Sequence, residues 1–115
     1  MSEFFHRNPD KRDERDENGR TPLLLALQTR REEVAATLLE LGASPDKADR
    51  YGGTPLMAAA HLGLVSSAKL LVALGADVRA KDTVDGLTAI DFASMDNHHE
   101  IVDLLRKRIA AQDGV

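Results

Sequence analysis

Cysteine and tryptophan are absent from the sequence, which contains only one tyrosine and three phenylalanines. The lack of cysteine excludes disulfide bonds, thiolate metal sites and cysteine nucleophiles. A β-sandwich would need more aromatic residues, whereas leucine and alanine are abundant here and favour closely packed helices. We therefore expect an all-α protein that is stabilised by side-chain packing.

Long hydrophobic runs and an excess of basic residues are also missing. The longest apolar stretches, residues 22–27 and 56–60, are far shorter than the roughly 20 residues that cross a bilayer. The N-terminal residues have no apolar segment followed by a cleavage site, so we expect no secretory leader. The 15 basic and 19 acidic residues are intermixed and give a net charge of −4, which offers no basic surface to a phosphate backbone. We expect a cytoplasmic protein without a nucleic-acid or membrane partner. Because the chain begins with Met and ends in a polar unit, we also expect it to be complete.

The sequence does contain an internal repeat of 33 residues. The segments DENGRTPLLLAL from Asp16, DRYGGTPLMAAA from Asp49 and DTVDGLTAIDFA from Asp82 are each followed by a second helical stretch, and the third has one additional residue before its Thr. Helices this short are not stable alone in water and must pack on their neighbours. The repeat predicts three stacked helix-turn-helix units, residues 16–48, 49–81 and 82–115, preceded by an N-terminal extension or cap at residues 1–15.

Helix signals recur at matching positions of the three units. A Thr can cap the first helix of each unit, and a Pro follows it in the first two units, where the first helical position tolerates proline. In the third unit, Thr88 and Asp91 approximate a capping box. The break between the two helices favours a left-handed residue, which Gly63 and Asn97 suit well and Arg30 suits poorly.

The units resemble ankyrin repeats, whose pattern is D-x-x-G-x-T-P-L-H-x-A-A-x-x-G-H followed by a helix that ends in L-L-x-x-G-A-D. The family's His after T-P-L is replaced here by Leu24, Met57 and Asp91. The resemblance implies an all-α ankyrin-repeat solenoid with projecting β-turn loops. The second unit fits best, at Asp49, Gly52, Thr54, Pro55, Leu56, Ala59, Ala60, Gly63, Leu71, Gly75, Ala76 and Asp77.

No residue pattern indicates catalysis. The densest polar cluster is His98, His99 and Glu100, but adjacent helical residues point about 100° apart, so the two His side chains do not face one ion. The resemblance instead gives His98 a structural position at the start of the second helix. A glycine-rich phosphate loop is absent, and we expect no catalytic residue, no metal ion and no cofactor.

The resemblance implies protein binding through the turn tips and the inner faces of the first helices. Such a rigid concave strip loses little conformational entropy when a partner docks. For Leu62 and Met95, packing within the helix pair is an equal alternative. Carried over position by position, the expected contact residues are Arg20, Gln28, Arg50, Tyr51, His61, Leu62, Val84, Asp85, Leu87, Met95 and Asp96.

These observations predict a monomeric, non-catalytic module that binds a protein partner, for example a cytosolic inhibitor, immunity or adaptor protein. The alternative is a structural protein that self-associates through Phe4 and Phe5 or through the ends of the stack. The same two phenylalanines also fit a cap over an exposed face of the first unit, formed by Leu24 and Val34.

Overall fold

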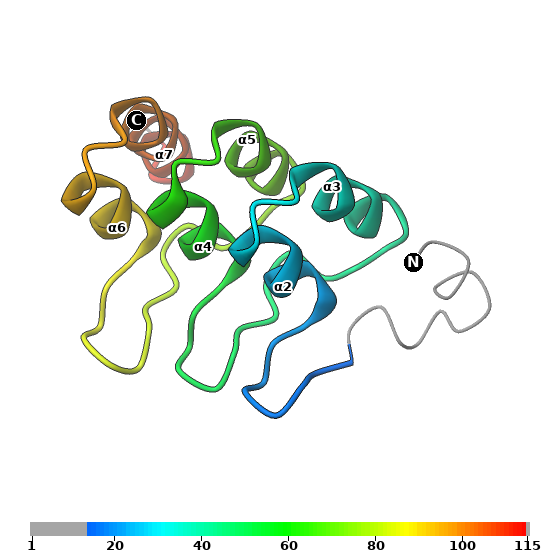
Figure 1. Cartoon of the computed structure of the whole chain (residues 1–115). Coiled ribbons are helices and arrows are strands. Elements are labelled where there is room, and N and C mark those ends of the chain that lie inside the picture. The colour runs from blue at the N-terminus through cyan, green and yellow to red at the C-terminus, as the bar shows by residue number, and fades with distance from the viewer. Residues whose placement is uncertain (1–13, 115) are drawn as a thin grey trace.

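The computed structural model describes residues 14–114, which form six α-helices and no β-strand (Figure 1). The helices form three consecutive pairs: α2 (Pro22–Gln28) with α3 (Glu32–Glu40), α4 (Pro55–Leu62) with α5 (Val65–Ala73), and α6 (Ala89–Met95) with α7 (His99–Gln112). The all-α architecture of stacked helix-turn-helix units is thereby confirmed. Within the described range, no helix is long and apolar enough to span a membrane. The structural predictions for Phe4 and Phe5 lie outside this range.

The helices form two rows, which place the first helices of the units on one side and the second helices on the other (Figure 1). Helix α4 packs between α2 and α6, while α5 packs between α3 and α7. Leucines and alanines of both rows share one hydrophobic core, which includes Leu27, Leu38, Ala59, Leu71 and Leu105. Alanine at these contacts lets neighbouring helices approach closely, so each short pair gains its burial from the next.

Each first helix begins at the expected capping threonine. The hydroxyl of Thr21 accepts a hydrogen bond from the Leu24 amide at 3.2 Å, and Thr54 does the same for the Met57 amide at 3.2 Å. In the third unit, the amide and hydroxyl of Thr88 both donate to Asp91 Oδ2, at 2.9 and 3.0 Å. These bonds satisfy polar groups that the helix ends leave without partners.

The breaks between paired helices all adopt the left-handed conformation, with φ of 61° at Arg30, 73° at Gly63 and 60° at Asn97. Only glycine fits the middle break, because a Cβ on Gly63 would lie 2.7 Å from the His98 ring. One expectation about the first unit is wrong. Leu24 is 1% exposed, not part of an open face, since α4 of the second unit packs against its helix.

Candidate functional site

An aspartate organises each of the three turns that project beyond the helices. Asp16 Oδ1 accepts the amides of Asn18 and Arg20 at 2.9 Å, and Asp49 Oδ1 accepts those of Tyr51 and Gly53 at 2.9 Å. The third turn contains one more residue. Its anchor, Asp82, accepts the amides of Asp85 and Leu87 at 3.0 and 3.1 Å.

The backbone bonds lower the pKa of two of these anchors. The pKa of Asp16 lies below its ordinary value chiefly because the Arg20 amide donates to its carboxylate. The pKa of Asp82 is lowered chiefly by the Asp85 amide. Hydrogen bonds to the charged form stabilise it, so both carboxylates remain ionised near neutral pH.

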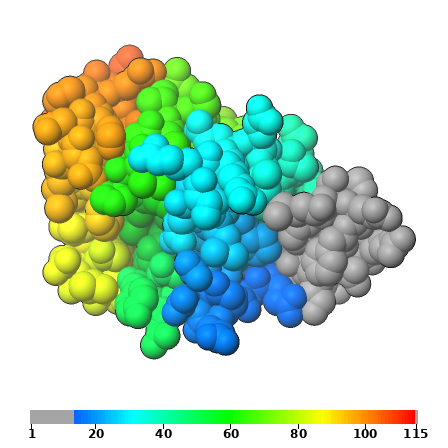
Figure 2. All heavy atoms as spheres, in the orientation of Figure 1, coloured from blue at the N-terminus to red at the C-terminus, as the bar shows by residue number. Residues whose placement is uncertain are grey.

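The three turns also bond to one another and form a continuous row, seen along the lower edge of Figure 2. The Arg50 amide donates to the Asn18 carbonyl at 3.1 Å, and the Thr83 amide donates to the Tyr51 carbonyl at 2.8 Å. Glycine permits these contacts, because a Cβ at Gly19 would lie 2.8 Å from the Arg50 nitrogen. The row is therefore held by main-chain bonds that leave its side chains available.

We call the surface formed by α2, α4, α6 and the turns at residues 16–20, 49–53 and 82–87 the inner face. An open hollow of about 160 Å³ lies in it. Helix α2 contributes two of its lining residues, α4 three and α6 one, and the second turn contributes Asp49 and Gly53. The lining residues are Leu24, Gln28, Asp49, Gly53, Thr54, Met57, Ala58, His61 and Phe92.

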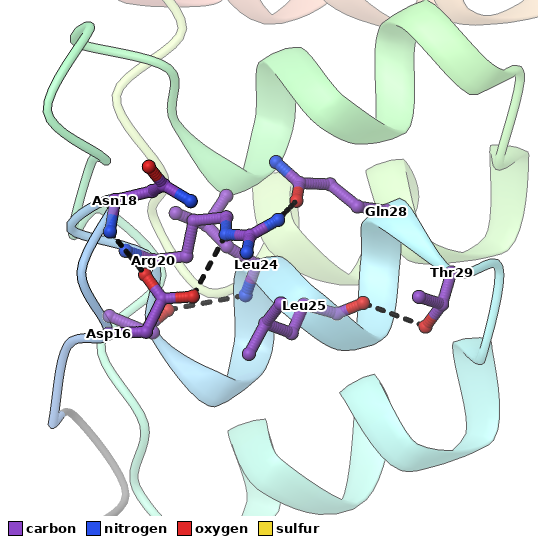
Figure 3. Close-up of polar contacts among 8 residues, drawn as sticks. Asp16, Asn18, Arg20, Leu24, Leu25, Gln28 and Thr29 are labelled. Atoms are coloured by element: carbon purple, nitrogen blue, oxygen red, sulfur yellow. Dashed lines mark hydrogen bonds and ion pairs between the residues drawn. The ribbon is translucent and has the colours of Figure 1, made fainter.

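In the first unit, the polar side chains of the inner face bond to one another. Arg20 donates from Nε to Asp16 Oδ2 at 3.0 Å and from a terminal nitrogen to Gln28 Oε1 at 3.4 Å (Figure 3). The guanidinium group thus connects the first turn to the last residue of α2. Two predicted contact residues, Arg20 and Gln28, are brought together here, but their polar groups already have partners within the chain.

Two histidines connect the second unit to the third. Nδ1 of His61 lies 2.7 Å from Asp96 Oδ2, and its ring meets Phe92 edge to face with centroids 6.2 Å apart. His98 Nε2 lies 3.0 Å from the main-chain carbonyl of His61. His98 therefore occupies a structural position between units, whereas His61 and Asp96 are brought together on the inner face.

The predicted apolar and aromatic residues that are exposed lie on the second and third units. The Tyr51 side chain is 52% exposed and has the Arg50 guanidinium 5.3 Å from its ring centroid. Val84 and Met95 are 65% and 64% exposed. Asp85 is also exposed at the tip of the third turn.

Leu62 and Leu87 are less exposed than Tyr51, Val84 and Met95. Both are half-buried, and Leu62 packs against the hydrophobic core. The Leu62 carbonyl also accepts a hydrogen bond from Arg30 at 3.2 Å. The Leu62 side chain therefore packs against the core, which is the alternative stated for it above. The Met95 side chain, by contrast, is exposed to solvent.

The hollow contains residues that the position-by-position reasoning missed, including Met57, Ala58 and Phe92. Helical spacing could have identified the first two, because Met57 and Ala58 precede His61 by four and three residues and share its side of the helix. Across the described part of the chain, no cluster of three or more His, Asp or Glu side chains could hold a metal ion.

Stacked helical hairpins with a bonded row of turns define a repeat protein whose inner face contains an open hollow. The family model for Ankyrin repeats (3 copies) matches residues 2–82 and 48–113. The chain therefore belongs to the ankyrin repeat family, whose members generally mediate protein–protein interaction and are generally non-catalytic. A search of curated proteins found no match.

Proposed function

We propose that this protein binds a protein partner through the inner face, chiefly at its second and third units, and carries out no reaction of its own. The supporting observation concerns exposed apolar side chains. Of the four large hydrophobic residues exposed in the described range, Tyr51, Val84 and Met95 belong to the inner face and only Leu74 lies elsewhere. Exposed apolar groups gathered on one surface favour a docking role over a purely solvated one.

The way the second and third turns are held supports the same function. Tyr51 and Val84 project from turns that are joined by the bond between Tyr51 and Thr83, so docking has little backbone freedom to remove. Tyr and Arg are the residue types that contribute most to binding energy at protein interfaces. The adjacent pair of Arg50 and Tyr51 supplies both at the centre of the row.

A rigid module without a reaction of its own acts by covering a surface of its partner or by joining two partners. We therefore propose an inhibitory, immunity-type or adaptor role, performed by a monomer in the cytoplasm. Self-association remains the competing hypothesis, and the two make opposite predictions for light scattering. A constant molecular mass across a concentration series supports the monomer.

The binding surface can be tested by partner capture from a lysate of the organism that encodes the chain. Tyr51→Ala/Val84→Ser should lose a protein that the wild type retains. Leu74→Ala is the matched control, because Leu74 is 50% exposed, close to the 52% of Tyr51, but lies at the end of α5. Recovery of the same partner by all three proteins would contradict the proposed surface.

A further inference from the structure

Charge is distributed unevenly along the inner face. The segment from the first turn to the first break, residues 16–31, contains two acidic and three basic residues. The corresponding residues 49–64 contain one acidic residue, one basic residue and one histidine. Residues 82–98 contain four aspartates and no lysine or arginine. The third unit is thus the acidic end of the inner face. It also carries Val84 and Met95, two of the three exposed hydrophobic residues of that face.

The carboxylates of this end differ in what they are free to bind. Asp82 and Asp91 accept backbone or hydroxyl hydrogen bonds within their own turn and helix start. Asp96 faces His61 on the surface. The exposed Asp85 carboxylate forms no ion pair and no side-chain hydrogen bond with another described residue, and it adjoins the exposed Val84.

Two basic residues border this area without neutralising it. The Arg50 guanidinium lies over the Tyr51 ring, and Lys81 precedes the third turn. Neither forms an ion pair with Asp85 or Asp96 among the described residues. The third unit therefore combines two exposed apolar side chains, Val84 and Met95, with the Asp85 carboxylate, which has no ion-pair partner among the described residues.

We propose that the partner presents a segment in which lysine or arginine alternates with apolar residues, and that this segment docks on the third unit of the inner face. The inference rests on the proposed function and specifies the chemistry of the partner. Apolar side chains would cover Val84 and Met95, while a basic group pairs with Asp85. An acidic segment would place like charges together, and an uncharged one would remove water from Asp85 without replacing its interactions.

The proposal can be tested with a random peptide display library selected on the full-length chain. Wild-type protein should enrich peptides that combine Lys or Arg with apolar residues. Asp85→Lys should lose those peptides, whereas Asp103→Lys should retain them, because it makes the same charge change at an exposed position of α7 in the other row of helices. Synthetic copies of the enriched peptides should bind Asp85→Asn about 3- to 10-fold more weakly, and less so at high salt.

Testing the enriched peptides against Tyr51→Ala as well separates failure of this inference from failure of the proposed function. One outcome is a set of peptides that lose binding to Tyr51→Ala and yet are acidic, or bind Asp85→Lys as well as the wild type. Such peptides overturn the charge assignment but leave the proposed binding surface in place. Peptides that depend on neither Tyr51 nor Asp85 bind elsewhere and contradict both. A selection that enriches no peptide overturns the docking of a linear segment, and partner capture by the inner face then tests the function separately.

Discussion

The first and third turns have the same backbone hydrogen-bonding arrangement but present different side chains to solvent. An aspartate accepts two amides in each turn, through Asp16 in the first and Asp82 in the third. In the first unit, Arg20 then binds back to Asp16 and Gln28. In the third unit, the additional residue extends a turn on which Val84 and Asp85 remain exposed.

The comparison shows that the residues repeated in each unit stabilise the backbone, whereas the residues that vary between units determine the surface. Aspartate, glycine and threonine recur where the backbone needs an acceptor, a positive φ or a cap. The surface residues between them can differ without disturbing the stack, as Arg20 in the first unit and Val84 and Asp85 in the third do. Function is therefore to be sought where equivalent surface positions diverge, and the first and third units diverge most in charge.

The largest expected difference between these units concerns the helix position occupied by Leu24 and Asp91. Leu24 is buried against the second unit, so Leu24→Ala should lower the free energy of unfolding by about 2–5 kcal/mol. Asp91 bonds Thr88 at a half-buried helix start, and Asp91→Ala should lower it by about 1 kcal/mol. Urea titrations of both variants beside the wild type measure the two values. Equal losses would show that the two positions do not have the different roles assigned here.

A smaller difference is expected at the breaks between paired helices. Arg30 and Asn97 both have a positive φ, but a left-handed conformation costs an arginine more than an asparagine. Arg30→Gly should therefore raise the free energy of unfolding by about 0.5 kcal/mol, after the entropic cost of glycine is subtracted. Asn97→Gly should leave it nearly unchanged.

The control for this comparison is Arg30→Ala, which removes the bond to the Leu62 carbonyl and keeps a side chain in the left-handed region. It should be no more stable than the wild type. If Arg30→Ala and Arg30→Gly have the same stability, backbone strain at this break is not the cause of the gain.

Much of this fold could be predicted from the sequence because its signals are local and repeated. The caps at Thr21 and Thr54, the left-handed positions at Gly63 and Asn97, and the longer third turn each follow from the type and spacing of neighbouring residues. Three copies of the same pattern then require the helix pairs to pack in order. Leu24 was misjudged because its burial depends on the neighbouring unit.

The candidate surface was less predictable, because it depends on side-chain partners distant in the sequence. His61 pairs with Asp96 35 residues later, and Phe92 reaches the hollow beside α4 from the third unit. Repeat spacing placed His61 on the inner face but could not reveal which groups it contacts. The internal bonds of Arg20 were likewise hidden, although they decide how much of that side chain is available to a partner.

The smallest expected difference concerns acid sensitivity of the two outer turns. Because the folded-state pKa values of Asp16 and Asp82 are lowered, each carboxylate contributes stability that is present above its ordinary value of 3.8. That contribution is lost as the pH falls through the lowered folded-state pKa. Asp16→Asn and Asp82→Asn keep an acceptor oxygen but do not titrate.

Each Asn variant should therefore be less stable than the wild type near neutral pH, and the difference should shrink in acid, as urea midpoints at a series of pH values can measure. Salt separates the two turns. Both aspartates accept backbone amides, but among the described residues only Asp16 also pairs with a basic side chain, that of Arg20, so added NaCl should reduce the effect of Asp16→Asn more than that of Asp82→Asn. A pH-independent difference would refute the linkage, and equal salt responses would show that the Arg20 ion pair adds nothing to the first turn.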